Sequence, residues 1–182
     1  MIRIIIFAVV SVFLVYVSRK ALFRPHSHGF YRFFGWEAML ALVLLNALQW
    51  FQNPFCPRQL ISWGLLFISL FLAGHGVYLL KVIGKPNQNR SDEGLFAFEK
   101  TSSLVCVGAY KYIRHPLYSS LFFFTWGAFL KYLSWPGLLL AFFVSFCLFF
   151  TAKNDESECL QYFGKTYEEY MKGTKRFVPF LF

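Results

Sequence analysis

Five apolar stretches, each about as long as a membrane-crossing helix, constrain the fold of this chain more than any other feature. They cover residues 2–17, 34–51, 60–80, 117–133 and 136–151. A helix that rises about 1.5 Å per residue needs roughly 17–25 apolar residues to cross the hydrocarbon layer of a bilayer. Hydrophobic residues make up 57% of the chain, whereas soluble domains are about 45–50% apolar. We therefore expect an all-α integral membrane protein with about five transmembrane helices.

The last two stretches are joined by a very short connection. Residues Ser134 to Gly137 separate them, which predicts a tight helical hairpin. Pro136 suits the first turn of the fifth helix, because a missing N–H costs nothing at that position.

Positive charges predict how the helices are oriented. Most of the 18 Lys and Arg residues lie between 18 and 33, between 81 and 116, or after 151. These three segments share one side of a five-span protein. Because cytoplasmic loops are rich in Lys and Arg, we expect the N-terminus outside and the C-terminus in the cytoplasm. Orientation and attraction to anionic headgroups account for the net charge of +9, so nucleic-acid binding is excluded.

Other features narrow the class of protein further. The four cysteines show no C-x-x-C pair, and His26, His28, His75 and His115 show no ligand spacing, so we predict no metal. The first apolar stretch lacks a small-x-small cleavage site and is followed by basic residues, which indicates a retained span rather than a signal peptide.

The chain divides by composition into two parts. Residues 1–80 carry three apolar stretches, and residues 81–182 combine a polar loop, the hairpin and a polar C-terminal segment. A transporter would place its polar groups near the midplane of the bilayer. Here the long polar segments 81–116 and 152–182 fall on the predicted cytoplasmic side, which favours an enzyme that works at the membrane surface. We expect residues 81–182 to form its catalytic region, ending in a cytoplasmic helix.

The first polar segment contains the run V-G-A-Y-K-Y-I-R-H-P-L-Y over residues 107–118. Pro116 predicts a new helix there, whose N-terminus offers unpaired N–H groups and partial positive charge. With Arg114 and His115 beside it, this is a candidate anion site. Alternatively, Arg114 reaches the headgroups and the tyrosines form an interfacial belt.

The second polar segment is acidic and then aromatic. Asp155 and Glu156 follow the fifth stretch, where a helix C-terminus would favour cations, although the start of a new helix explains them as well. Phe163, Tyr167 and Tyr170 are spaced as on one helix face. This stripe predicts either a packed interfacial helix or the wall of a cofactor site.

Taken together, these segments carry a recognisable pattern. The order G-x-Y-x-x-x-R-H-P-x-Y, a helical hairpin, acidic residues, F-G-x-x-Y-x-x-Y and R-F-x-P resembles the isoprenylcysteine carboxyl methyltransferase family. The related phospholipid N-methyltransferases share much of it. The resemblance covers residues 102–182, and the first three spans match only in hydropathy. In that family S-adenosyl-L-methionine lies at the cytoplasmic end of the hairpin, and lipid enters sideways between helices.

The resemblance implies an activity and a set of partners. We expect a membrane methyltransferase that uses S-adenosyl-L-methionine on a lipid-like acceptor, above all the carboxylate of an isoprenylcysteine-type substrate. The implied partners are a lipid or prenylated substrate and the surrounding membrane lipids. No obligate protein partner is inferred.

The resemblance also implies a site, carried over residue by residue. It places cofactor contacts at Leu104, Val105, Tyr110, His115, Pro116, Leu117, Tyr118, Asp155 and Glu156. Arg114 and Glu156 are the candidate catalytic residues. Arg114 could position an anionic acceptor or the cofactor's carboxylate, and Glu156 could accept hydrogen bonds from the cofactor's ammonium or ribose. Tyr110, Tyr112 and Tyr118 are candidates for aromatic faces against the sulfonium.

Two departures from the family pattern bear on the acceptor. The family usually has Glu-Glu where this chain has Asp155-Glu156, and it often has a substrate-binding arginine at the position of Thr151. Thr151 favours the alternative of a phospholipid or small-lipid N-methyltransferase. An amine acceptor would need a base, for which His115 or Glu156 is the candidate.

Two further alternatives stay open. A sterol-reductase-like enzyme using NADPH would carry comparable R-H-P-x-Y and R-F-x-P motifs, although this chain is short for one. A non-catalytic membrane subunit that keeps the fold would fit Thr151 and Asp155. His75, between two glycines in the third stretch, is either a helix-to-helix hydrogen-bonding residue or a catalytic one.

Overall fold

The computed structural model describes residues 1–25, 27–85 and 99–179 of the chain. These residues form six α-helices and two short 3-10 helices, with no β-strand among them. The α-helices are α1 (Ile2–Leu22), α2 (His28–Leu45), α3 (Pro57–Val82), α4 (Pro116–Phe129), α5 (Trp135–Phe163) and α6 (Lys165–Gly173), and the 3-10 helices are η1 (Ala47–Gln49) and η2 (Gly108–Lys111).

The helices α1 to α5 correspond to the five apolar stretches. Three of them, α1, α3 and α5, are long and apolar enough to cross a membrane. The helix α2 has 18 residues and α4 has 14. At about 1.5 Å per residue, α4 rises only about 21 Å, against a hydrocarbon layer of about 30 Å. The all-helical architecture is confirmed, whereas the count of five spans stays a prediction.

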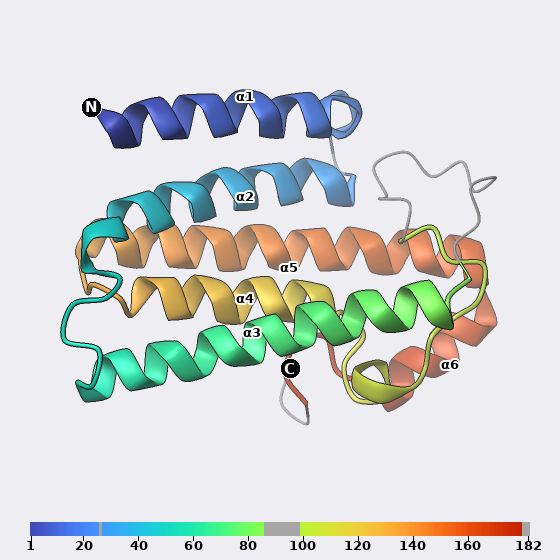
Figure 1. Cartoon of the computed structure of the whole chain (residues 1–182). Coiled ribbons are helices and arrows are strands. Elements are labelled where there is room, and N and C mark those ends of the chain that lie inside the picture. Colours follow the sequence, from blue (N-terminus) through green and yellow to red (C-terminus); the bar gives the residue numbers. More distant parts are fainter. Residues whose placement is uncertain (26, 86–98, 180–182) are drawn as a thin grey trace.

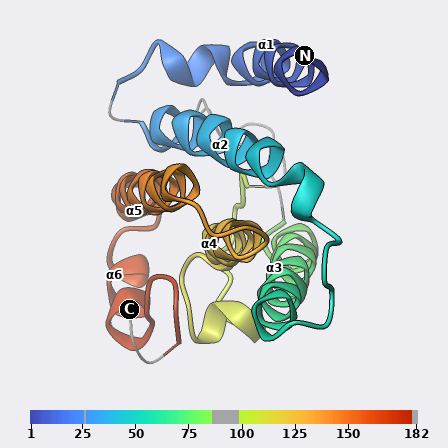
Figure 2. The ribbon, with the colours of Figure 1, turned by 90° about the vertical axis from the view of Figure 1, so that its left-hand side faces the viewer.

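The helices α1 to α5 lie side by side, with their axes nearly parallel (Figure 1). The end view in Figure 2 shows α1 outside α2, and a row of α5, α4 and α3 beneath α2. Packing runs mainly between α2 and α5 and between α3 and α4. Fully buried small residues such as Ala128 and Ala141 lie beside Leu42 in the core, which lets the helix backbones approach closely.

Local sequence explains where the helices begin. Proline occupies the first turn of α3, α4 and α5, where the first N–H groups have no intrahelical partner. The side chain of Ser27 caps α2 by accepting from the Phe30 N–H, and Ser134 caps α5 by accepting from the Gly137 N–H. The predicted hairpin of α4 and α5 is confirmed, with Pro136 in the first turn of α5.

Several helix boundaries differ from those of the apolar stretches, most clearly in α2 and α5. The helix α2 begins at His28 and ends at Leu45, because the fully buried Asn46 leaves the helix and donates from Nδ2 to the Ala128 carbonyl at 2.8 Å. The helix α5 continues past Thr151 to Phe163. Its apolar part ends near Thr151, and its last turns are polar.

The aromatic stripe expected on a single helix is divided between two. Phe163 ends α5, whereas Tyr167 and Tyr170 belong to α6. Gly164 separates the two helices with φ +59°, a left-handed conformation that glycine adopts without a Cβ penalty. The single-helix interpretation was therefore wrong.

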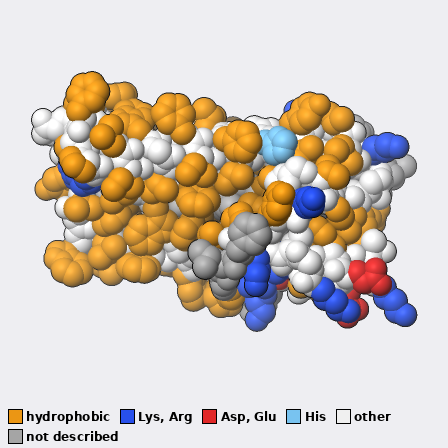
Figure 3. Space-filling view, turned by 90° about the horizontal axis from the view of Figure 1, so that it is seen from below, with side chains coloured by type: hydrophobic (Ala, Val, Ile, Leu, Met, Phe, Trp, Pro, Cys, Tyr) orange, Lys and Arg blue, Asp and Glu red, His pale blue; other side chains and the backbone are white. Residues whose placement is uncertain are grey.

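Apolar and charged side chains separate along the long axis of the molecule. In Figure 3 hydrophobic side chains cover most of the surface, and acidic and basic side chains gather toward the end that carries α6. Large apolar side chains such as Ile4, Phe67 and Leu139 are exposed on the helices. An exposed apolar surface of this extent requires cover, and lipid supplies it for helices that cross a membrane.

The two parts of the chain do not pack as separate units. Helix α2 of the first part lies along α5 of the second, and α3 of the first lies along α4. The division near residue 80 therefore describes a proposed difference in role within one helical bundle.

Candidate active site

The two motifs R-H-P and R-F-x-P lie side by side at the polar end of the bundle. The N–H of Arg114 donates to the Lys175 carbonyl at 2.7 Å, and the Lys175 N–H donates to the Tyr112 carbonyl at 3.0 Å. A parallel β-bridge pairs Ile113 with Lys175. These backbone bonds hold the C-terminal segment against the start of α4.

Glu156 on α5 is the centre of a buried ion cluster. Its carboxylate accepts from Arg114 Nε at 2.8 Å and from Arg176 Nη2 at 2.6 Å and Nε at 3.0 Å. His115 Nε2 lies 3.4 Å from the same carboxylate. Arg114 Nη1 also donates to the carbonyls of Met171 and Thr174. Glu156 thereby joins α5 to both motifs.

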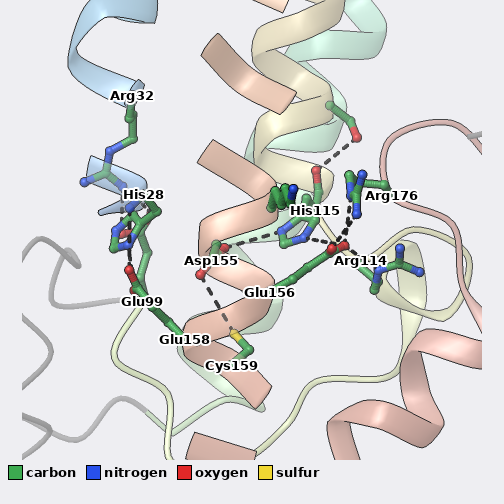
Figure 4. Close-up of polar contacts among 12 residues, drawn as sticks. His28, Arg32, Glu99, Arg114, His115, Asp155, Glu156, Glu158, Cys159 and Arg176 are labelled. Atoms are coloured by element: carbon green, nitrogen blue, oxygen red, sulfur yellow. Dashed lines mark hydrogen bonds and ion pairs between the residues drawn. The ribbon is translucent and has the colours of Figure 1, made fainter. Parts of the chain in front are cut away.

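Asp155, the neighbour of Glu156, contacts the other side of the His115 ring. Its Oδ2 lies 3.4 Å from His115 Nδ1, and Figure 4 shows the imidazole between the two carboxylates. Burial opposes protonation of His115, but the hydrogen bonds to Asp155 and Glu156 outweigh it and raise the pKa of His115 above 6.5. Burial likewise opposes ionisation of Glu156, but contacts with His115 and Arg176 outweigh it and hold the pKa of Glu156 well below 4.5. The site thus alternates acidic and basic side chains.

A cavity opens beside this cluster, with about 700 Å³ of empty space, part of it open to solvent. Its wall combines the end of α3, the segment before η2, η2 itself, the start of α4, the end of α5 and α6. The wall residues are Leu80, Glu99, Thr101, Leu104, Val105, Tyr110, Arg114, His115, Leu117, Tyr118, Asp155, Cys159, Phe163, Tyr167 and Tyr170.

Aromatic rings form much of this wall. The rings of Phe163 and Tyr167 stack with centroids 6.5 Å apart, and Tyr170 Oη donates to the Tyr110 carbonyl at 2.6 Å. Burial is the main cause that raises the pKa of Tyr110, Tyr167 and Tyr170, so the phenols stay neutral at physiological pH. Neutral aromatic faces in a partly enclosed cavity suit a cationic ligand.

Most of the residues predicted from the sequence meet at this cavity. Leu104, Val105, Tyr110, Arg114, His115, Leu117, Tyr118 and Asp155 all line it. Pro116 and Glu156 are absent from the lining residues, and Tyr112 is exposed outside the cavity. Glu156 instead holds Arg114 and His115 through the ion cluster.

Some residues of the site were not predicted from the sequence. Glu99 lines the cavity and accepts from Arg32 Nη1 of α2, at 3.2 Å and 3.1 Å to its two oxygens. These residues are far apart in sequence, so no local pattern indicates the pair. Arg176 belongs to the R-F-x-P motif. Its distance in sequence from R-H-P does not indicate that Arg114 and Arg176 both bind Glu156.

Near the cavity, three potential metal ligands approach one another. Ligand atoms of His28, Asp155 and Glu158 lie within 4.8 Å of each other, a grouping that the histidine spacing did not indicate. His28 Nδ1 and Glu158 Oε2 are joined directly at 2.7 Å. This ion pair accounts for the approach of α2 to α5 without a metal ion.

Thr151 and His75, which the sequence singled out, both lie outside the cavity wall. Thr151 is fully buried in α5 and donates to the Cys147 carbonyl at 2.8 Å, so it faces the core. His75 stacks on Phe71 and packs against Gly108, where an added Cβ would lie 2.5 Å from His75 Nε2. Neither side chain is among the residues that line the cavity.

Comparison with known proteins gives one match. A family model described as phospholipid methyltransferase matches residues 59–168, which is more than half of the chain and includes every predicted site residue. No curated protein and no solved structure matches the chain.

Proposed function

This chain belongs to the phospholipid methyltransferase family, and from that membership we propose that it transfers a methyl group from S-adenosyl-L-methionine to a lipid acceptor. The observation that carries the proposal is the cavity at the polar end of the bundle, where aromatic rings and the carboxylates of Asp155 and Glu99 share one wall. Both a water-soluble cofactor and a lipid headgroup could reach this end of the molecule.

The residues of the cavity fit the proposed cofactor. Leu104, Val105 and Leu117 offer apolar surface, and the rings of Tyr110 and Tyr118 offer faces for a cation. When bound, S-adenosyl-L-methionine supplies an electrophilic methyl group on a positively charged sulfur.

The ion cluster is proposed to orient the site. Methyl transfer needs donor and acceptor in line and about 3–3.5 Å apart, so positioning dominates the catalysis. Glu156 holds Arg114 and His115 in their places in the wall. Arg114 is then proposed to bind a carboxylate of the cofactor or acceptor, and Glu156 to act through Arg114 and His115 rather than by contact with the ligand.

An amine is the acceptor that the cavity favours. Its wall carries the carboxylates of Asp155 and Glu99, whereas position 151, at which the resemblance assigns a substrate-binding arginine, is a buried threonine. An amine must also lose a proton during the reaction, and His115 with Asp155 is the titratable pair in the wall that could move it.

A carboxylate acceptor is the second candidate. The sequence resemblance implies O-methylation of an isoprenylcysteine-type lipid, and Arg114 in the wall is the observation that favours it. Arginine binds carboxylates through paired N–H donors, although two Arg114 nitrogens already donate within the protein.

The first experiment is calorimetric titration of the detergent-purified protein with S-adenosyl-L-methionine and with S-adenosyl-L-homocysteine. We expect saturable binding that weakens at least tenfold in Asp155→Asn and is unchanged in Glu158→Gln, which alters an acid on the same helix outside the cavity wall. Absence of binding to folded wild-type protein would overturn the proposal in favour of the reductase or non-catalytic alternative.

Methyl transfer to lipids then separates the acceptors. With labelled S-adenosyl-L-methionine, an amine-headgroup phospholipid and a prenylated cysteine with a free carboxylate are compared at equal concentration. We expect methylation of the amine lipid. Methylation of the prenylated cysteine alone would assign the protein to carboxyl methylation.

A further inference from the structure

Helix α2 presents two basic side chains, one turn apart, toward the polar end of α5 and the cavity. His28 Nδ1 pairs with Glu158 on α5 at 2.7 Å. Arg32, four residues later and therefore on the same helix face, pairs with both oxygens of Glu99. Arg32 and Glu99 are largely buried, with side chains 7% and 12% exposed. In the view of Figure 4 both pairs lie on the opposite side of Asp155 from Arg114 and Arg176.

The two pairs differ in one respect. Glu99 lines the cavity, whereas Glu158 does not. Burial of a carboxylate is costly unless a charged partner holds it, and Arg32 is the partner that holds Glu99 in the wall. Glu156 is bound within its own ion cluster away from the wall, which leaves Glu99 and Asp155 as the carboxylates among the cavity's lining residues.

We propose that Glu99 is an ammonium-binding residue of the cavity and that Arg32 is its positioning residue. The inference rests on the proposed function and adds a positioning residue on α2, Arg32, which lies outside the family match at 59–168. A carboxylate beside neutral aromatic rings complements an ammonium through both a charge-assisted hydrogen bond and the ring faces.

Tyr110 is an aromatic residue of the same cavity wall that feels the charge of Glu99. Burial raises the pKa of Tyr110, and the charges of Asp155 and Glu99 add to this effect. The phenol therefore stays neutral within the field of both carboxylates. The wall around Tyr110 thus combines carboxylates with neutral aromatic surface, a combination that suits a cation.

Two ligands could supply the ammonium. One is the α-ammonium of the cofactor, and the other is the headgroup amine of the lipid acceptor. Methylthioadenosine separates them, because it keeps the nucleoside and the thioether but lacks the amino-acid part of the cofactor.

The test compares Glu99→Gln and wild-type protein in calorimetric titrations with S-adenosyl-L-homocysteine and methylthioadenosine, and in methyl-transfer assays with an amine lipid. If Glu99 binds the cofactor ammonium, Glu99→Gln weakens S-adenosyl-L-homocysteine at least tenfold and leaves methylthioadenosine within twofold. If it binds the acceptor, both dissociation constants stay within twofold and KM for the amine lipid rises at least tenfold. Either result supports the proposal.

Arg32 is tested in the same assays. Arg32→Gln is expected to reproduce the selective loss seen in Glu99→Gln, and Arg32→Lys to restore part of it because a lysine can still pair with the carboxylate. His28→Gln is the matched control, since it removes the other basic side chain of the same helix face and should leave every dissociation constant and KM within twofold.

The outcomes separate failure of this inference from failure of the proposed function. If wild-type protein binds S-adenosyl-L-homocysteine but Glu99→Gln changes neither binding nor KM, the inference is wrong and the function stands. If Glu99→Gln weakens S-adenosyl-L-homocysteine and methylthioadenosine equally, and His28→Gln weakens them to the same extent, the Arg32–Glu99 pair is only a structural contact and the inference is wrong. Absence of binding by the wild type would overturn both.

Discussion

Glu156 is buried; it accepts hydrogen bonds from Arg114 and from the partly exposed Arg176, and it lies 3.4 Å from the buried His115. Glu156→Gln keeps the shape but removes the charge that these cations share. Breaking a buried ion pair costs about 3–5 kcal/mol, so we expect a loss of roughly 3 kcal/mol of stability and a large loss of activity. Thermal unfolding in detergent, followed by circular dichroism, measures the first effect.

Asp155→Asn is the contrasting variant, because Asp155 lines the cavity while Glu156 does not. It should lower cofactor affinity with a smaller change in melting temperature than Glu156→Gln. Equal melting temperatures of Glu156→Gln and wild type would contradict the role of Glu156 as the centre of the ion cluster.

The same cluster predicts how stability depends on pH. The pKa of His115 is raised, so its contribution is present below about pH 6.5, its ordinary value, and is lost as pH rises through the raised pKa. The pKa of Glu156 is lowered, so its contribution is present above about pH 4.3, its ordinary value, and is lost as pH falls toward the lowered pKa. We expect stability to fall on both sides of a mildly acidic maximum.

Melting temperatures measured across pH check this expectation, with His115→Gln as the control. Asp155, Glu156 and the stacked ring of Tyr118 surround His115, and the variant keeps them. Its alkaline decline should be smaller than that of the wild type. An identical pH profile in the two proteins would remove His115 as the source of the alkaline limb.

Some wall residues could be predicted from a short motif, whereas others depend on partners far away in the sequence. Tyr110, His115 and Tyr118 could be predicted because one short motif holds all three, and a proline marks the start of the following helix. The ion pair of Arg32 with Glu99 joins α2 to the segment after α3. Such a pair depends on how helices pack, which no local pattern records.

At the scale of elements, Gly108 is the point where η2 meets α3. Its φ of +59° lies in the left-handed region, and an added Cβ would lie 2.5 Å from His75 Nε2 and 2.8 Å from Leu79 Cδ1. Left-handed backbone costs a non-glycine residue about 1–2 kcal/mol. We expect Gly108→Ala to cost more than that, because strain and a clash add together.

Two variants separate the strain from the clash. Gly164 has the same φ of +59° but nothing within 4 Å of an added Cβ, so Gly164→Ala should show the strain alone. Adding His75→Ala to Gly108→Ala should recover part of the loss. Urea or thermal unfolding gives the differences, and no recovery in the double variant would show that the clash with His75 does not contribute to the loss.

Helix boundaries show where sequence reasoning reached its limit. Pro116 and Pro136 indicated the starts of α4 and α5, because proline acts locally on the backbone. The helix α3 begins at Pro57, three residues before its predicted apolar stretch. The polar continuation of α5 to Phe163 has no apolar signal, and packing against α2 and α6 stabilises it instead. The sequence did not indicate the break at Gly164, because Phe163, Tyr167 and Tyr170 keep the spacing of a single helix across it.

At the scale of the whole molecule, the bundle brings together segments that are far apart in the chain. The C-terminal segment lies along the start of α4, and α2 reaches the cavity through Arg32. The apolar stretches predict the helices but not which helices are neighbours in the bundle, because any apolar face can pack on another. The buried charges supply part of the missing specificity, because a packing that buries Glu156 or Glu99 without its cations is costly.

The predicted orientation can be tested with the protein's own cysteines. Cys56 precedes α3, Cys106 follows it, and Cys159 lies in the polar end of α5. With the N-terminus outside, Cys56 faces outward, and Cys106 and Cys159 face the cytoplasm. Single-cysteine variants in sealed vesicles of known orientation, treated with a membrane-impermeant maleimide, should show Cys56 labelled from outside and the other two labelled only after permeabilisation.

The pair Cys106 and Cys159 addresses the short helix α4. Two crossings, α4 and α5, separate these cysteines, so labelling from the same side requires that α4 crosses the membrane despite its 14 residues. A 14-residue helix can cross only where the layer is thinned or where neighbouring helices shield its ends, and α4 packs against both α3 and α5. Labelling of Cys106 and Cys159 from opposite sides would make α4 a buried helix that enters the bundle without crossing, and the cavity residues on either side of the hairpin could then no longer share one aqueous face.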